Sequence, residues 1–311
     1  MIRVAVIGAG AVGCYYGARL LEAGHDVRFL MRRDFEVVKA NGLHITSPEG
    51  DLHLEQPTVV ARPEELGTVD WALCALKATA APYYKDLIGP CLSDGTRILA
   101  LMNGLGVEDQ LADLFGAERV YGGLAYVAIN RDAPGVIRHM ALGHITIGRF
   151  LADAGEETQA LGLWADTKIP ATLTPSLLMS RWDKLGWNVP FGGIGVAAGG
   201  ITTDRIVDDP ELRALARATM DEVLAAGNAD LAAHGEEARL DRVSISKRYF
   251  TWTDSLGPYR SSIVIDFAEG RPLEVEAIFE EPLRRARALG VEVPRLALLS
   301  ALLRSLSLAE S

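Results

Sequence analysis

The sequence contains few cysteines, and their scarcity excludes two common ways of stabilising a fold. Three occur among 311 residues, at Cys14, Cys74 and Cys91, each within an apolar run and far from the others. They provide neither a disulfide framework nor the paired ligands of a zinc site. We therefore expect no metal site and a reducing, cytoplasmic setting.

Long hydrophobic stretches are also missing. No window offers about 18 uninterrupted apolar residues, which a membrane-spanning helix needs. The first residues run directly into a strand pattern, without the basic region, apolar stretch and cleavage site of an export signal. We expect neither export nor contact with a membrane.

The chain has fewer basic than acidic residues. Lys and Arg total 31 against 41 Asp and Glu, so the net charge is -10. Nucleic-acid binding is therefore not expected, because counterion release needs a basic surface. An anionic ligand must instead be held by a few local cations and backbone donors. The hydrophobic content of 49% indicates a soluble globular protein, and the length favours two domains.

The first half of the chain alternates short apolar runs with helical or loop segments. Such alternation is typical of a parallel sheet with crossover helices. The runs are Ile2–Ile7, Val27–Leu30, Trp71–Leu76, Ile98–Met102 and Val120–Ile129.

Near Pro170 the pattern changes to helical periodicity. Helices are expected over about 212–226, 240–256, 261–268 and 274–289, with Asp209 capping the first and Gly290 following the last. The predicted fold is α/β, with a Rossmann-type parallel-sheet domain over residues 1–172 and an all-helical domain over 173–311. The apolar helices of the second domain suggest a homodimer.

A glycine-rich loop follows the first strand directly. It reads Gly8-Ala9-Gly10-Ala11-Val12-Gly13 and opens a helix. In a dinucleotide-binding unit the first glycine permits a tight turn, the second admits the pyrophosphate and the third lets the helix approach the strand. A glycine turn that serves packing alone would share the motif, but the strand before it and the helix after it favour cofactor binding.

The end of the second strand carries Arg32 and Arg33, where an NAD enzyme usually places an acidic residue. Two guanidinium groups suit the 2′-phosphate of NADP(H). Asp34 follows at once and would reach a ribose hydroxyl if the strand ended later, so NAD stays open as the alternative. A solvated strand end would explain the arginines without any ligand.

Two further polar residues follow predicted strands. Lys77 comes after one and Asn103 after the next, at the strand ends where open α/β sheets bind ligands. For either residue alone, a polar loop residue without a function is as good an explanation as a functional residue. In the second domain, Lys184 and Asn188 are four apart and share a helical face. Ser261 and Ser262 begin a helix, where they would either receive a carboxylate or simply cap the helix.

These residues together resemble the ketopantoate reductases (2-dehydropantoate 2-reductases) over essentially the whole chain. The resemblance rests on the glycine loop, Leu76-Lys77-Ala78, Asn103-Gly104-Leu105-Gly106, Trp182-Asp183-Lys184-Leu185 with Asn188, Ser261-Ser262, and Gly270-Arg271-Pro272-Leu273-Glu274. Members join a Rossmann domain to a helical domain and reduce ketopantoate to pantoate with NADPH, a step towards pantothenate and coenzyme A.

The resemblance implies roles for individual residues. Lys184 is the general acid, and Glu274 lies near the cofactor and the reacting centre. The cofactor side comprises Gly8, Ala9, Gly10, Ala11, Val12, Gly13, Arg32, Arg33, Lys77, Asn103, Ala128 and Glu274. The substrate side comprises Asn103, Lys184, Asn188 and Ser262. A lysine beside a carboxylate is expected to stay protonated near pH 7, as an acid should.

The chain departs from the family pattern at several positions. Gly192 and Tyr259 stand where asparagines are usual, and Glu276-Ala277-Ile278-Phe279-Glu280-Glu281 replaces the asparagine-glycine pair that the family usually has on that helix. The small residues around Gly192 are interpreted as a close helix contact. Gly192 and Tyr259 keep open the alternative of a reductase of another branched 2-oxo acid. A non-catalytic NADPH-binding protein on the same scaffold is a separate alternative.

Overall fold

The computed structural model describes residues 1–151 and 157–309, which form two compact units. Unit 1 comprises residues 1–102 and 107–177, and unit 2 comprises residues 103–106 and 178–311. The chain passes from one to the other after Leu177, five residues beyond the expected boundary. The reason is β10 (Ala171–Leu173), which pairs with β9 and so keeps this stretch in the sheet.

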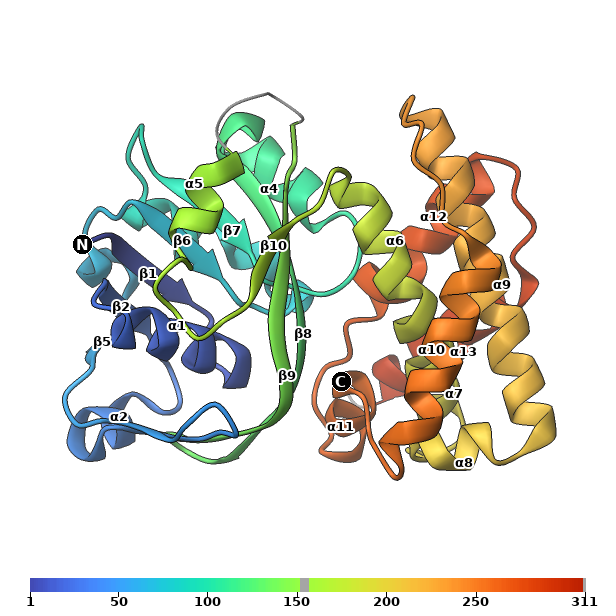
Figure 1. Ribbon diagram of the computed structural model, residues 1–311, viewed down its shortest axis with the longest axis horizontal. Coiled ribbons are helices and arrows are strands. Elements are labelled where there is room, and N and C mark those ends of the chain that lie inside the picture. The colour runs from blue at the N-terminus through green and yellow to red at the C-terminus, as the bar shows by residue number, and fades with distance from the viewer. Residues whose placement is uncertain (152–156, 310–311) are drawn as a thin grey trace. The chain divides into compact units, whose positions relative to one another are not determined.

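Unit 1 is built on one sheet, which has ten strands in the described residues. The strand order is β4-β3-β9-β8-β7-β6-β1-β2-β5, with β10 beside β9. Figure 1 shows the long strands β8 and β9 side by side, with β10 next to them. The strands besides β10 are β1 (Arg3–Ile7), β2 (Asp26–Leu30), β3 (Leu43–Thr46), β4 (Leu52–Leu54), β5 (Thr58–Val60), β6 (Trp71–Cys74), β7 (Arg97–Ala100), β8 (Val120–Ala133) and β9 (Val136–Arg149).

The centre of the sheet is parallel, as the sequence predicts. Strands β5, β2, β1, β6, β7 and β8 run parallel to one another. The residues from Val4 to Ile7 are completely buried, as expected of a strand covered on both faces. The sheet as a whole is mixed, because β8 and β9 form a long antiparallel hairpin and β3 pairs antiparallel with β4.

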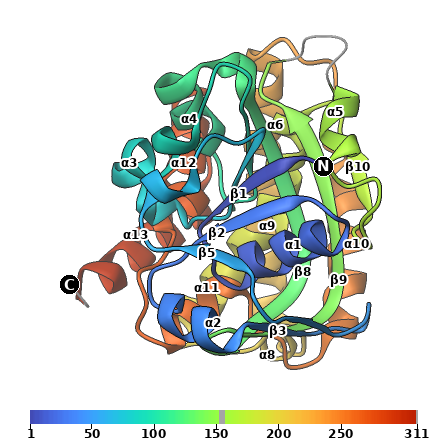
Figure 2. The ribbon, with the colours of Figure 1, turned by 90° about the vertical axis from the view of Figure 1, so that its left-hand side faces the viewer.

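Helices cover this sheet, and α1 (Ala11–Glu22) packs against β1, β2, β8 and β9 (Figure 2). Gly17 lets it come close, because a Cβ there would lie 2.6 Å from the Phe29 ring. The other helices of unit 1 are α2 (Phe35–Asn41), α3 (Tyr84–Ile88), α4 (Val107–Phe115) and α5 (Glu157–Gly162).

Unit 2 contains helices and no strand among its described residues, as the sequence predicts. They are α6 (Leu177–Trp187, whose first residue belongs to unit 1), α7 (Gly193–Ala197), α8 (Thr203–Val207), α9 (Pro210–Ala233), α10 (Arg242–Leu256), α11 (Ser262–Ala268), α12 (Glu281–Ala288) and α13 (Pro294–Ala309). Asp209 caps α9 by accepting bonds from the backbone N–H groups of Glu211 and Leu212, which confirms the predicted helix start.

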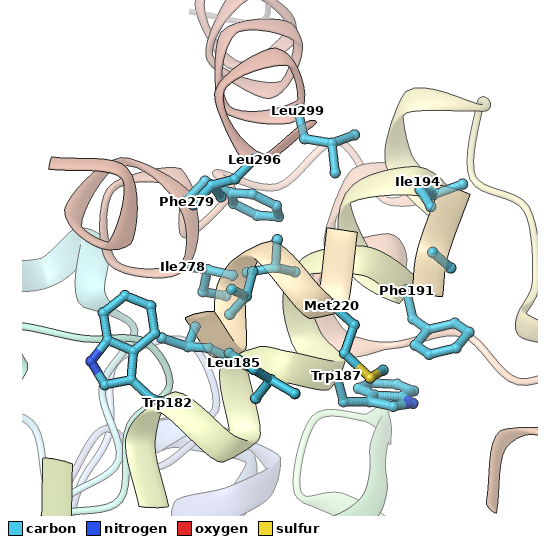
Figure 3. Close-up of a cluster of buried hydrophobic side chains, with 14 of the residues drawn as sticks. Trp182, Leu185, Trp187, Phe191, Ile194, Met220, Ile278, Phe279, Leu296 and Leu299 are labelled. Carbon is cyan, nitrogen blue, oxygen red and sulfur yellow. The ribbon is translucent and has the colours of Figure 1, made fainter. Parts of the chain in front are cut away.

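Two π-helical segments interrupt the helices of unit 2. Segment η5 (Asn188–Gly192) continues α6, and segment η6 (Glu276–Glu280) precedes α12. They pack against each other within the apolar core, where Trp187, Phe191 and Phe279 are buried (Figure 3). Segments of this kind are frequent at functional sites, because they re-aim side chains along a helix.

The three cysteines are free and buried, and burial raises the pKa of Cys14 to about 12. No helix among the described residues is long and apolar enough to cross a membrane.

Candidate active site

The three glycines of the loop after β1 have the conformations that a dinucleotide-binding turn requires. Gly8 adopts φ +95°, and a Cβ there would lie 2.6 Å from the backbone of Ala75 on the neighbouring strand end. A Cβ on Gly13 would lie 2.3 Å from the Gly8 carbonyl oxygen, so only glycine lets α1 start this close to β1. A Cβ on Gly10 would meet nothing within 4 Å, which leaves room for a pyrophosphate.

Arg32 and Arg33 are exposed directly after β2, whereas Asp34 is buried. Both oxygens of the Asp34 carboxylate are engaged. Oδ1 accepts a bond of 3.0 Å from Arg131 Nη1, and Oδ2 accepts one of 3.2 Å from the Gly135 backbone N–H. The strand ends at Leu30, so the turn exposes the arginines and directs Asp34 inwards.

Lys77 follows β6 and is exposed, at the residue before the 3₁₀ segment η2 (Ala78–Tyr83). Strand β6 lies beside β1 in the parallel part of the sheet, so Lys77 and the glycine loop follow neighbouring strands at the same edge. Ala128 lies within β8, opposite Ala141 of β9. The prediction that Lys77 follows a strand is confirmed.

Asn103 follows β7, and residues 103–106 are held within unit 2. The Leu105 backbone N–H donates to the Ala277 carbonyl oxygen at 2.8 Å. Gly104 adopts φ +92°, and a Cβ there would lie 2.4 Å from the Ala277 Cβ. The segment that begins with Asn103 is thus fastened to the π-helical segment that follows Glu274.

Lys184, Arg181 and Glu274 interact electrostatically in unit 2. The pKa of Lys184 is lowered to about 7, chiefly by burial and further by the Arg181 guanidinium, while the Glu274 carboxylate opposes both. Glu274 is 4% exposed and Arg181 is 2% exposed. The expectation that Lys184 stays protonated near pH 7 is therefore met only in part, because burial and Arg181 outweigh Glu274. A lysine with a pKa near neutrality exchanges its proton readily.

Lys184 and Asn188 are separated by the change from α-helix to π-helix, because α6 ends at Trp187 and η5 starts at Asn188. Both side chains are half-buried. Asp183, between Arg181 and Lys184, pairs instead with Arg248 of α10 at 2.6 Å. Adjacent charged residues on α6 therefore have different partners.

Ser261 and Ser262 have different environments. Ser262 is exposed at the start of α11, whereas Ser261 is 6% exposed and its hydroxyl finds no hydrogen-bond partner among the described residues. It does not cap its own helix. Simple capping by Ser261, one of the two expectations for this pair, is therefore wrong.

The small residues around Gly192 do form a close helix contact, as predicted. A Cβ on Gly192 would lie 2.8 Å from the Ile263 side chain, and one on Gly193 would lie 2.9 Å from the Phe279 ring. Tyr259 lies beside Trp187, with ring centroids 6.3 Å apart. Of the two positions where the family pattern has asparagines, Gly192 thus contacts the Ile263 side chain and Tyr259 contacts the Trp187 ring.

Sequence reasoning missed two residues of these clusters. Arg181 lies one turn before Lys184, directly before the motif that carried the resemblance, and its spacing of three was a usable signal. Arg131 lies 97 positions from Asp34, and no local pattern connects the two.

Two family models match the chain in succession. Residues 4–152 match the model described as "Ketopantoate reductase PanE/ApbA", and residues 176–307 match its C-terminal counterpart, "Ketopantoate reductase PanE/ApbA C terminal". The first match lies mostly in unit 1 and the second lies mostly in unit 2.

Individual relatives agree over nearly the whole length. The 2-dehydropantoate 2-reductase of Nostoc sp. is 34% identical, covering 94% of this chain and 92% of its own. A crystal structure of 2-dehydropantoate 2-reductase from Geobacter metallireducens is 39% identical with a TM-score of 0.93, covering 98% of this chain and 99% of that one. D-mandelate dehydrogenase with NADH and anilino(oxo)acetate is similar in fold alone, with 19% identity, a TM-score of 0.87 and coverage of 99% and 98%. The chain belongs to the ketopantoate reductase family.

Proposed function

We propose that this protein reduces ketopantoate to pantoate with NADPH, in the route to pantothenate and coenzyme A, with Lys184 as general acid. The observation that carries the proposal is the half-buried Lys184, whose pKa of about 7 is set by burial, Arg181 and Glu274. The family membership and the near-complete match to named 2-dehydropantoate 2-reductases support the substrate.

The chemistry divides between the cofactor and the side chains. NADPH, when bound, supplies the hydride that is added to the C2 carbonyl carbon. The Lys184 ammonium donates a hydrogen bond to the ketone oxygen, stabilises the negative charge that develops there and transfers its Nζ proton to it. Glu274 orients the ammonium and favours its charged form. Asn188, Ser262 and Asn103 hold the substrate's polar groups.

The proposed cofactor contacts involve the loop of residues 8–13, Arg32, Arg33, Lys77, Asn103, Ala128 and Glu274. The room above Gly10 supports a pyrophosphate at the start of α1. NADPH rather than NADH is supported by two exposed arginines after β2 and by the inward direction of Asp34.

A substrate panel with both nicotinamide cofactors tests the proposal. We expect kcat/KM for ketopantoate with NADPH to exceed that of every other combination. Comparable values for several other 2-oxo acids would contradict the specific substrate, and no turnover of any 2-oxo acid would favour a non-catalytic NADPH-binding protein.

A second candidate function is the reduction of another branched 2-oxo acid on the same scaffold. Gly192, packed against Ile263, and Tyr259, packed against Trp187, favour it, because neither residue offers the amide that the family usually has there. The same panel distinguishes the two candidates.

Replacing Arg32 and Arg33 together with alanine is expected to weaken NADPH binding at least about tenfold and to leave NADH binding nearly unchanged. The two guanidinium groups address the 2′-phosphate, which NADH lacks. Titration of protein fluorescence with each cofactor measures both constants. The double variant Arg62→Ala with Arg138→Ala is the control, since it removes the same charge from two exposed arginines. Equal losses for NADPH and NADH would refute the role in 2′-phosphate recognition.

We also propose a cytoplasmic homodimer. Three free, buried cysteines suit a reducing compartment. On α13, Leu298 and Leu302 are 59% and 43% exposed and four residues apart, so they share one apolar face. Light scattering of the purified protein would give the mass of one chain if the protein were monomeric, and of two if the proposal holds.

A further inference from the structure

Arg131 lies at the far end of strand β8, yet it joins the turn that follows β2. Its Nη1 donates to Asp34 Oδ1 at 3.0 Å, and Asp34 directly follows Arg32 and Arg33. The pair is sheltered, with the Asp34 side chain 7% exposed and the Arg131 side chain 32% exposed. The long hairpin of β8 and β9 thus brings a third guanidinium to the turn that already carries two.

The tip of this hairpin is fixed in place. The Gly135 backbone N–H donates to Asp34 Oδ2, and the Gly135 carbonyl oxygen accepts from the His44 backbone N–H at 2.9 Å. Gly135 adopts φ +71°, and a Cβ there would lie 3.1 Å from the Val38 side chain of α2. The position of Arg131 is therefore defined by contacts from both sides of the turn.

The Asp34–Arg131 pair also lies close to the glycine loop. The Cys14 thiol donates to the Ala9 carbonyl oxygen at 3.3 Å, and both Asp34 and Arg131 act electrostatically on the pKa of this thiol. Arg131 thus acts electrostatically on Cys14 in the first turn of α1 and is bonded to Asp34, the residue after Arg33. In a Rossmann unit the adenosine ribose and its 2′ substituent occupy the region between these two features.

Asp34 is the type of residue that binds a ribose hydroxyl in NAD enzymes, but both of its carboxylate oxygens already accept hydrogen bonds within the protein. One oxygen holds Arg131 and the other holds Gly135, so the carboxylate neutralises only one of three neighbouring arginines. A guanidinium has five N–H donors, and the bond to Asp34 uses one of them. The remaining donors form a planar array suited to a phosphate.

We propose that Arg131 is a third cation of the cofactor site, oriented by Asp34 to bind the 2′-phosphate of NADPH. This inference rests on the proposed function, because it presupposes NADPH as the cofactor. It assigns Asp34 the role of a positioning residue instead of a ligand for a ribose hydroxyl.

Binding of four probes to the full-length protein tests the inference without relying on turnover. NADPH and adenosine 2′,5′-bisphosphate carry the 2′-phosphate, whereas NADH and AMP do not. For Arg131→Ala we expect Kd to rise at least about tenfold for the first two and to stay within about twofold for the last two. Arg138→Ala is the matched control, because it removes one positive charge from an arginine of the same hairpin that pairs with Asp132 and is 52% exposed. It should leave all four constants within about twofold.

Two further variants separate binding from folding. Arg131→Lys keeps a cation beside Asp34 and should fold normally, yet lose several-fold in NADPH affinity because the planar fork is gone. Asp34→Asn keeps an acceptor for Gly135 and should weaken NADPH while sparing NADH. Thermal unfolding without cofactor checks the fold of each variant.

The outcomes distinguish this inference from the proposed function. Suppose that the parent protein prefers NADPH and that Arg131→Ala leaves this preference unchanged. The inference alone is then overturned. If Arg131→Ala fails to fold, Arg131→Lys takes its place in this comparison. Equal loss of NADPH and NADH, or a selective loss of NADH in Asp34→Asn, overturns the inference as well. If the parent protein binds NADPH no more tightly than NADH, the proposed cofactor fails and the inference fails with it.

Discussion

Replacing Lys184 with alanine is expected to lower kcat by about 10³-fold while NADPH binding changes little. The lysine acts on the oxygen that becomes an alkoxide, so its loss removes both the proton and the charge that stabilises the oxygen. Steady-state rates with ketopantoate give kcat, and fluorescence titration gives the cofactor constant. Lys184→Arg should recover little, because an arginine stays protonated at every working pH and cannot release its proton.

Two controls make the lysine experiment specific. Lys247→Ala removes an exposed lysine from α10 of the same unit and should not alter turnover. A small primary amine added to Lys184→Ala should restore part of the rate if the defect is the missing acid, whereas a merely structural defect would not respond. Turnover of Lys184→Ala within about threefold of the parent would show that the lysine is not the acid.

Local signals in the sequence were enough to predict the parts of the fold that are themselves local. Strand β1, the glycine loop and α1 are contiguous, and the same holds for the capped start of α9 at Asp209. Strand β9 was not anticipated, because its pairing partners β8 and β3 are chosen by long-range register. The short strands β3 and β4 present too few residues for an alternating pattern to be recognised.

The candidate site divides in the same way. Lys184, Glu274 and the glycine loop could be named from motifs, because each motif lies within a few residues. The direction of Asp34 could not, since it depends on Arg131 and Gly135 from a hairpin about a hundred positions later. The pKa of Lys184 could not either, because burial dominates it and burial is a property of the folded unit.

Replacing Glu274 with glutamine is expected to lower kcat about 10²-fold at pH 8 and to move the pH profile to lower pH. Lys184 must be protonated to act, so kcat/KM of the parent should fall as pH rises through about 7, the pKa that burial, Arg181 and Glu274 set together. Glu274 is the group that opposes the other two. Without its charge the pKa of Lys184 drops further, and the acid is lost at lower pH.

A neighbouring carboxyl group provides the control for this profile. A hydrogen bond with Glu280, together with burial and repulsion, raises the pKa of Glu276 to about 7, so this group titrates in the same range. Glu276→Gln removes that titration and leaves Glu274 in place. If Lys184 sets the profile, the falling limb stays where it is in Glu276→Gln and shifts only in Glu274→Gln. A limb that moves with Glu276→Gln and not with Glu274→Gln would assign the titration to Glu276 and remove the support that pH dependence gives to Lys184 as the acid.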